Sequence, residues 1–114
     1  MVDNKVQIKK NSRELFVRQK IGQILKESVP GARVLLYGSH ARGENHSDSD
    51  WDLLVILPKE KVEPSEYENI SYPLYEYGWQ LGELFSVKIY SEKEWNKRSF
   101  TPFFKNVEKE GIAL

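Results

Sequence analysis

Two aspartates separated by a single residue mark the start of an apolar segment in the middle of the chain. Asp50 and Asp52 flank Trp51, and the apolar residues 53–57 follow directly. Alternate side chains of a strand project from the same face, so the two carboxylates would lie together and Trp51 would point into the core. Mg²⁺ is commonly held by one or two carboxylates plus substrate phosphates, and a cation would relieve the repulsion within the pair. The pair therefore suits a divalent ion, although a lone pair of this kind is more often only solvated.

A glycine and a serine follow the preceding apolar segment, Arg33–Tyr37. Gly38 lets the backbone turn sharply and lets N–H groups approach an anion closely, while Ser39 offers a hydroxyl. A helix beginning at Ser39 would add the partial positive charge of its N-terminus. Taken alone, a Gly-Ser pair after a strand is usually only a turn, so both interpretations stay open at this point.

The loop between these two pairs carries further polar side chains. Arg42 could hold a phosphate, because its guanidinium bonds oxygens in pairs, or it could form an ion pair with Glu44 or Asp48. Ser47 or Ser49 could orient an aspartate or cap the loop locally, and local capping is the favoured interpretation.

Two histidines and a second glycine complete this loop. Neither His40 nor His46 has other ligand-type residues at metal-binding spacing, so we expect both imidazoles to lie on the surface. Gly43 is expected to occupy a turn.

Length and composition limit the class of protein. The 114 residues predict one domain, and 39% apolar residues with three Trp, six Tyr and five Phe predict a packed core. The 17 Lys and Arg balance the 17 Asp and Glu, so no net field recruits nucleic acid or an anionic membrane. Basic residues gather in residues 1–20, where a solvated helix face is favoured over a polyanion site.

The absence of cysteine excludes disulfides, thiolate chemistry and cysteine-ligated zinc. No apolar run approaches the roughly 20 residues of a membrane-spanning helix, and the N-terminus lacks the apolar core of a signal peptide. These features predict a cytoplasmic protein without a membrane segment.

Periodicity predicts an α/β (α+β) domain with a small mixed sheet of three or more strands flanked by helices. Asn11 and Glu14 predict a capping box for the first helix, and Pro73 predicts a kink or a break in the second. The orientation of the third strand stays open. The predicted helices cover Ser12–Ser28, Ser65–Gly82, a segment capped by Ser91 with Glu94, and Pro102–Gly111, with a helical turn over Ser39–Arg42; the predicted strands are Arg33–Tyr37, Trp51–Leu57 and Leu84–Tyr90.

Together these residues resemble the signature of the minimal nucleotidyltransferases in the DNA polymerase β-like superfamily. The match consists of Gly38-Ser39, the ten residues His40–Ser49, and Asp50 with Asp52, between two apolar strands. It covers residues 35–57, and the size and element order agree with the small core of that family. The resemblance implies that residues 1–114 form a single minimal nucleotidyltransferase domain.

The resemblance also implies a reaction and a role for each motif residue. The domain would transfer a nucleoside monophosphate, usually AMP from ATP, to an acceptor hydroxyl and release pyrophosphate. Asp50 and Asp52 would be the catalytic residues and would ligate Mg²⁺. The nucleotide would be held by Gly38, Ser39, Arg42 and Ser49.

One departure from the family pattern concerns the third predicted strand. Active members generally carry a third carboxylate there, as the base for the acceptor hydroxyl. Leu84–Tyr90 contains Ser86 and Lys88 but no acid, and Glu83 is the nearest candidate. Glu83 could equally be a surface residue, and an inward-facing Lys88 would neutralise an aspartate. The alternative function is therefore a catalytically silent nucleotide-binding or protein-interaction module of the same fold.

The resemblance further implies a protein partner. Many small relatives act with a separate helical protein, commonly as the antitoxin paired with a HEPN-type toxin, and the acceptor would be a hydroxyl on that partner. An aromatic run along the second long helix exceeds what one helix face can bury, so it could form a partner or homodimer surface instead of core. The run consists of Tyr67, Tyr72, Tyr75, Tyr77 and Trp79.

Overall fold

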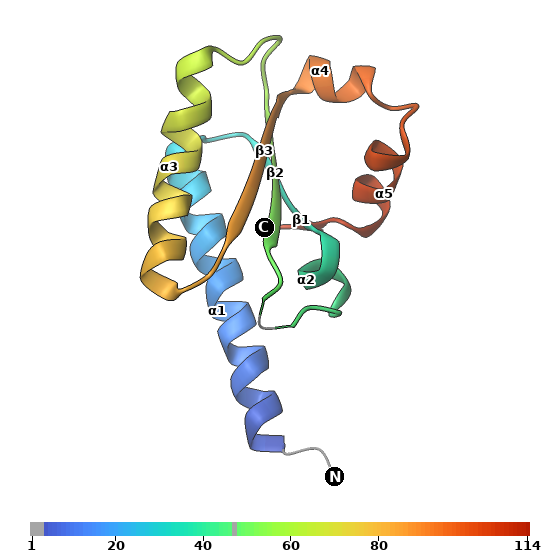
Figure 1. Cartoon of the computed structure of the whole chain (residues 1–114). Helices are drawn as coiled ribbons and strands as arrows, with labels where there is room; N and C mark the ends of the chain where they lie inside the picture. The colour runs from blue at the N-terminus through green and yellow to red at the C-terminus, as the bar shows by residue number, and fades with distance from the viewer. Residues whose placement is uncertain (1–3, 47) are drawn as a thin grey trace.

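The computed structural model of the chain describes residues 4–46 and 48–114. Its helices are α1 (Asn4–Ser28), α2 (Gly38–Arg42), α3 (Pro64–Leu81), α4 (Glu92–Lys97) and α5 (Pro102–Glu110), and its strands are β1 (Arg33–Tyr37), β2 (Trp51–Leu57), β3 (Phe85–Ser91) and β4 (Ile112–Ala113). They form the mixed α/β fold that the sequence predicts (Figure 1). Ser47 and the basic side chains before residue 12 lie outside the described parts of the chain.

The four strands form one mixed sheet in the order β3-β2-β1-β4. β1 runs antiparallel to β2 and β4, whereas β3 runs parallel to β2, which settles the orientation left open by the sequence. A parallel neighbour needs a crossover connection, and α3 supplies it. The short strand β4 was not predicted, because two residues are too few to show the alternation of apolar and polar residues that marks a strand.

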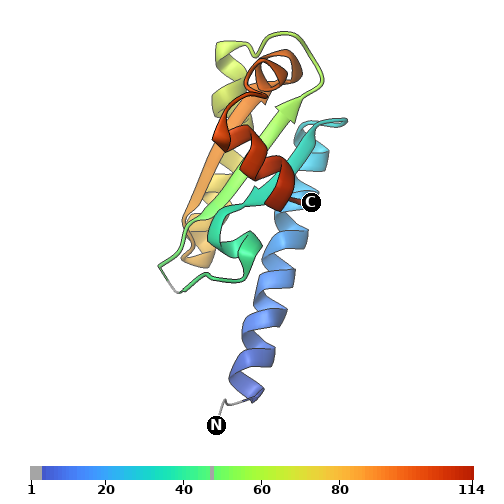
Figure 2. The ribbon, with the colours of Figure 1, turned by 90° about the vertical axis from the view of Figure 1, so that its right-hand side faces the viewer.

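Helices cover both faces of the sheet (Figures 1 and 2). Alternation along β2 directs residues of odd number, beginning with Trp51, towards α1 and α3, and Leu54 and Ile56 towards α4 and α5. Trp51 is only 1% exposed, which confirms its expected place in the core. The aspartates beside Trp51 therefore belong to the face that carries α4 and α5.

Two of the predicted helices differ from expectation. α1 begins at Asn4 rather than Ser12, so Asn11 lies inside the helix and does not cap it; residues 4–11 contain neither Gly nor Pro, and their lysines and glutamine favour helix. α3 runs through Pro73 as one helix and so lacks the break that was one of the two expectations there, because the buried Ile70 and Leu74 pack on the sheet on both sides of the proline. Among the described helices, none is long and apolar enough to cross a membrane.

Candidate active site

Strand pairing brings the Gly-Ser turn against the second aspartate. Tyr37, the last residue of β1, is the register partner of Asp52 on β2. Gly38 follows with a φ of 74°, in the left-handed region that favours glycine. A Cβ built on Gly38 would overlap a carboxylate oxygen of Asp52. The backbone at Gly38 and the Asp52 carboxylate therefore share one small space, which a larger residue would fill.

The two carboxylates have no hydrogen-bonding partner in the ranges 4–46 and 48–114. Asp50 is exposed and Asp52 is half-buried. Desolvation and then the neighbouring charge of Asp50 raise the pKa of Asp52, while Lys88, His40 and Arg42 act in the opposite direction. A partly desolvated carboxylate beside a second one, with its oxygens free, is a suitable ligand for a cation.

The strand β3 presents a cation beside the aspartates. Ser86 is the register partner of Asp52, and Lys88 is the register partner of Leu54, so both lie on the face that carries Asp52. The Lys88 ammonium lies 4.7 Å from the centre of the Phe103 ring. Over the described residues, no group of three or more His, Cys, Asp or Glu could hold a metal. The site therefore consists of two carboxylates flanked by a lysine.

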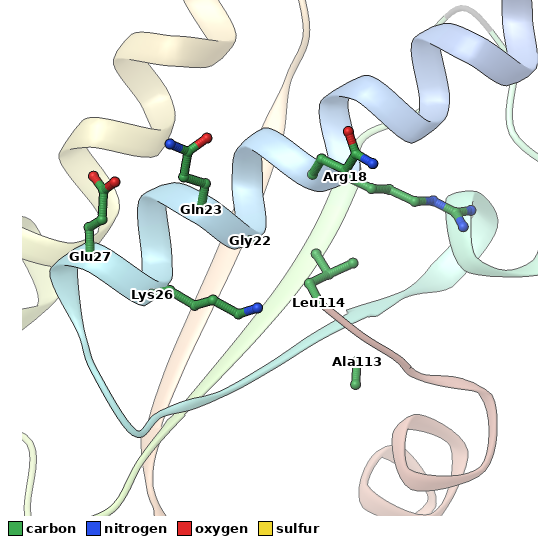
Figure 3. Close-up of a pocket in the computed structure, with 8 residues that line it drawn as sticks. Arg18, Gly22, Gln23, Lys26, Glu27, Ala113 and Leu114 are labelled. Atoms are coloured by element: carbon green, nitrogen blue, oxygen red, sulfur yellow. The ribbon is translucent and has the colours of Figure 1, made fainter.

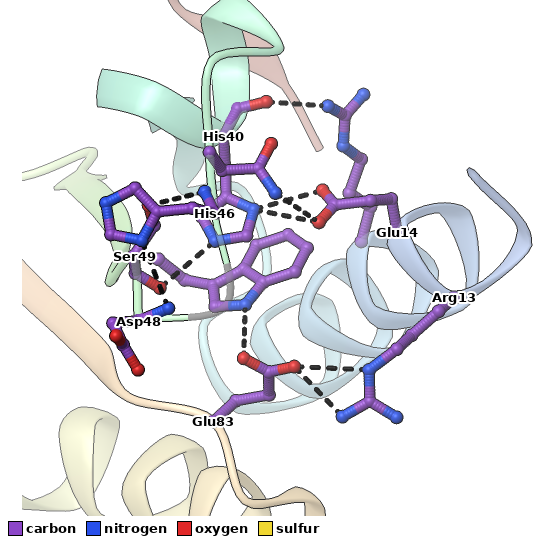
Figure 4. Close-up of polar contacts among 10 residues, drawn as sticks. Arg13, Glu14, His40, His46, Asp48, Ser49 and Glu83 are labelled. Atoms are coloured by element: carbon purple, nitrogen blue, oxygen red, sulfur yellow. Dashed lines mark hydrogen bonds and ion pairs between the residues drawn. The ribbon is translucent and has the colours of Figure 1, made fainter. Parts of the chain in front are cut away.

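Glu83 occupies a different place from the carboxylate pair. One of its oxygens accepts hydrogen bonds from Arg13 at 2.9 and 3.2 Å, and the other accepts from the indole N–H of Trp51 at 3.3 Å (Figure 4). Because Trp51 points towards α1 and α3, these bonds hold the Glu83 carboxylate on that side of the sheet. The structure does not bring Glu83 together with Asp50 and Asp52.

The remaining nucleotide-binding candidates lie in and after α2. Ser39 is half-buried in the first turn of α2, whose N–H groups have no acceptor within the helix. Arg42 is exposed and donates to Glu44 at 2.9 Å and to Glu110 at 3.5 Å. The Ser49 hydroxyl accepts from the His46 amide at 2.9 Å, so in this state it caps the loop. Arg42 and Ser49 thus both hold local partners that a nucleotide would have to replace.

His40 was expected on the surface, and this prediction is wrong. Its side chain is 3% exposed and stacks on the Trp51 indole, with ring centroids 3.8 Å apart. Its Nδ1 lies 3.0 Å from Glu14 of α1, and its Nε2 lies 3.2 Å from the Ser49 carbonyl. No local pattern could have signalled this burial, because Glu14 is distant along the chain. His46 is exposed, as expected.

A cleft of about 380 Å³ opens beside Gly38, between α2 and α5. Burial, with the charges of Asp52 and Tyr90, raises the pKa of Tyr37 in this cleft to about 12, so its hydroxyl stays protonated. A hollow of about 590 Å³ lies between α1 and β4, and Arg18, Lys26 and Leu114 are among the residues that line it (Figure 3). A third, of about 870 Å³, lies along α3. Of these three, only the cleft beside Gly38 contains motif residues.

The site thus combines a mixed α/β sheet, a glycine turn packed against Asp52 of β2, and a second carboxylate, Asp50, directly before that strand. Residues 18–112 match the nucleotidyltransferase domain family. A protein of Methanocaldococcus jannaschii, whose name provisionally assigns it to the protein adenylyltransferases, is 33% identical over 97 residues, which cover 85% of this chain and 90% of that protein. The chain therefore belongs to the nucleotidyltransferase domain family and is a transferase.

Two solved structures share the fold. One is a crystal structure of a toxin–antitoxin with AMP-PNP, with a TM-score of 0.57 and 22% identity over 83% of this chain and 69% of that chain. The other is a crystal structure of a mutant MntA–HpeT toxin–antitoxin, with a TM-score of 0.58 and 21% identity over 85% of this chain and 70% of that chain. At this level of identity they support the architecture.

Proposed function

We propose that this protein transfers AMP from ATP to a hydroxyl on another protein and depends on Mg²⁺. The observation that carries the proposal is the contact of Gly38 with Asp52, which joins an anion-accessible backbone turn to a carboxylate that no described residue bonds. The M. jannaschii relative is named for protein adenylylation, which favours AMP as the group transferred and a protein as the acceptor.

The donor set suits Mg²⁺ bound together with a nucleotide. Asp50 and Asp52 would hold the ion, and phosphate oxygens and water would complete its coordination, as is usual for Mg²⁺. When bound, the ion would neutralise phosphate charge and orient the triphosphate. A third protein ligand is not required for this kind of site.

The chain's own groups would position the substrates. The N–H groups at Gly38 and Ser39 would bind phosphate oxygens, and Arg42 would exchange Glu44 for a phosphate. The acceptor oxygen would form a bond to the α-phosphorus while the bond to pyrophosphate breaks, and the hydroxyl proton would leave to solvent or to a nearby carboxylate. Lys88, on the same face, would add positive charge beside the reacting phosphate.

The acceptor belongs to a partner in this proposal. Both structural neighbours come from toxin–antitoxin complexes, which favours a protein partner over a small-molecule acceptor. The family resemblance of the motif makes a helical, HEPN-type protein the partner that we propose. Tyr72 and Trp79 of α3 are 60% and 71% exposed, so part of the aromatic run is available for such a partner or for a second copy of the chain. A supply of ATP and Mg²⁺ would place the reaction in the cytoplasm.

A second candidate is a silent nucleotide-binding module of the same fold. Lys88 favours it, because a lysine on β3 cannot act as the carboxylate base that active members carry on that strand.

ATP binding measured by calorimetry with and without Mg²⁺ tests the site. We expect Mg²⁺-dependent binding that the Asp50→Ala/Asp52→Ala variant loses and that Asp48→Ala, a neighbouring exposed carboxylate, retains. Pyrophosphate release in the presence of the partner would separate the transferase from the silent module. Wild-type protein that is folded and binds no Mg²⁺–ATP, with or without the partner, would contradict both candidates.

A further inference from the structure

The residue between the two aspartates is held more firmly than core packing alone requires. The Trp51 indole stacks on His40 at an interplanar angle of 17°. It lies nearly perpendicular to the Phe85 ring, with the ring centroids 6.2 Å apart. Its N–H donates to Glu83 at 3.3 Å, and its backbone N–H donates to the Leu84 carbonyl at 2.8 Å. Both the face and the polar edge of the indole are therefore fixed.

His40, which stacks on the indole, and Glu83, which accepts its N–H, both bind side chains of α1. Glu14 lies 3.0 Å from Nδ1 of His40, and the preceding residue, Arg13, forms an ion pair with Glu83 at 2.9 Å (Figure 4). Arg18, one helical turn further along, donates to the His40 carbonyl at 2.9 Å. Two adjacent residues of α1 thus hold the Trp51 indole indirectly, Glu14 through His40 and Arg13 through Glu83.

His40 also reaches the residue that precedes the aspartate pair. A carbonyl only accepts hydrogen bonds, so the Nε2–H of His40 donates to the Ser49 carbonyl at 3.2 Å. Nδ1 then faces the Glu14 carboxylate, which also accepts from Asn45 at 3.1 Å. The imidazole therefore connects α1 to the segment that leads directly into Asp50.

We propose that His40 and Glu83 are positioning residues that fix the backbone of Asp50 and Asp52 through Ser49 and Trp51. Two carboxylates on one face repel each other while no cation is bound, and a loose segment would let them move apart. A backbone anchored on the opposite face of the sheet keeps them converged, so less ordering is needed when the ion and nucleotide bind. This inference rests on the proposed function for its ligand, but the anchoring itself belongs to the ligand-free protein.

The molecule contains a matched control for this arrangement. Near the other end of the strands, the Trp95 indole N–H donates to Glu108 at 2.8 Å, and Glu108 pairs with Arg33 at 3.1 Å. The chemistry is the same as in Trp51, Glu83 and Arg13, but no aspartate pair of the described residues stands beside Trp95. Glu108→Ala therefore removes an equivalent set of bonds without touching the candidate site.

The first test measures Mg²⁺–ATP affinity by calorimetry. We expect Glu83→Ala and His40→Ala to weaken it about tenfold, as is usual when a group behind a metal ligand is removed. We expect Glu108→Ala to lose thermal stability and keep its affinity. Glu83→Gln, whose amide oxygen can still accept from the indole, is expected to restore most of the affinity lost in Glu83→Ala.

Transfer kinetics then separate positioning from proton transfer. A positioning role predicts a higher KM for ATP in Glu83→Ala, with kcat changed less, and near-normal kcat in Glu83→Gln. If Glu83 acts as the base for the acceptor hydroxyl instead, Glu83→Gln will lose kcat by orders of magnitude and keep its nucleotide affinity. That result would overturn the inference.

Hydrogen exchange in the ligand-free protein tests, independently of any activity, whether His40 and Glu83 hold the backbone at Ser49 and Trp51. We expect the amides of Ser49 and Trp51, which bond the carbonyls of His46 and Leu84, to exchange faster in Glu83→Ala and His40→Ala than in Glu108→Ala. Equal rates in all three variants would overturn the anchoring even if wild-type protein binds Mg²⁺–ATP. If Glu83→Ala and His40→Ala exchange faster than Glu108→Ala while wild-type protein binds no Mg²⁺–ATP, the anchoring holds and only the proposed function fails.

Discussion

Gly38 shows how a single absent side chain can define a site. Its φ of 74° disfavours any other residue, and a Cβ would collide with Asp52. We expect Gly38→Ala to lower the free energy of unfolding by about 1–2 kcal/mol through backbone strain and to weaken Mg²⁺–ATP binding at least tenfold by displacing the carboxylate. Denaturant unfolding and calorimetry measure the two effects.

A matched glycine separates strain from displacement in that experiment. Gly31 has a φ of 84°, and a Cβ there would make only an ordinary contact, 3.8 Å from Pro58. Gly31→Ala should therefore reproduce the loss of stability and leave nucleotide affinity unchanged. Equal loss of affinity in both variants would show that Gly38 acts only through general stability.

Asp52 is expected to lower the stability of the ligand-free protein at neutral pH. Its raised pKa means that the folded state holds the proton more tightly than the unfolded state. The protonated Asp52 carboxyl therefore stabilises the folded state. This stabilisation is fully present below the ordinary aspartate pKa of about 3.9 and is lost as the pH rises through the folded-state pKa. We expect Asp52→Asn to raise the melting temperature by about 2 °C at pH 7 and to make no difference near pH 3. Thermal melts at the two pH values check this, and a lower melting temperature of the variant at pH 7 would contradict it.

The motif residues could be proposed from sequence because they lie close together along the chain. Gly38 and Asp52 meet through the pairing of two consecutive strands, which their flanking apolar segments predict. The surroundings of His40 and Glu83 could not be predicted, since their partners Glu14 and Arg13 come from α1 and meet them only after that helix docks. Local spacing can propose candidate ligands, whereas the residues packed behind those candidates depend on tertiary structure.

At the scale of the elements, the cap of α4 was predicted and is confirmed. The Ser91 hydroxyl accepts from the Glu94 amide at 3.0 Å, and Ser91 is fully buried. We expect Ser91→Ala to lower the free energy of unfolding by about 1 kcal/mol, because the Glu94 amide loses its acceptor. Urea unfolding measures the loss.

Nucleotide affinity should be unchanged in Ser91→Ala. Ser91 is the register partner of Leu57, whereas Ser86, at the other end of β3, is the partner of Asp52. A variant with wild-type stability would mean that water or another group replaces the cap.

Element boundaries were harder to predict where the local signals conflicted with packing. Asn11 with Glu14 has the pattern of a capping box, yet α1 continues through it to Asn4. Pro73 has the pattern of a helix break, yet the buried face of α3 continues across it. In both cases the local pattern is real, but it competes with helix propensity or with burial against the sheet.

At the scale of the whole molecule, ligand binding should appear as a change in thermal stability. A ligand that binds only the folded state stabilises it by about 2.7 kcal/mol at a hundred times its Kd. We expect ATP with Mg²⁺ to raise the melting temperature by about 10 °C, and ATP with EDTA to raise it much less. The Asp50→Ala/Asp52→Ala variant should show no metal-dependent rise. A rise of equal size in that variant would place the nucleotide elsewhere on the molecule.

The position of β3 at one end of the sheet has a consequence for solubility. As the outer strand in the order β3-β2-β1-β4, it leaves one row of backbone groups without a neighbouring strand among the described residues. Phe85–Ser91 consists mainly of aromatic, β-branched and hydroxyl residues, and Lys88 is its one charged residue. A lysine on an edge strand opposes the addition of strands from other molecules.

We therefore expect Lys88→Val to aggregate faster than wild-type protein on mild heating, as light scattering would show, and Lys93→Val, at an exposed position in α4, to behave like wild type. Similar aggregation of both variants would assign the effect to lost surface charge in general. Faster aggregation of Lys88→Val alone would give the lysine beside Asp52 a second role, as the residue that keeps one copy of the sheet from extending into another.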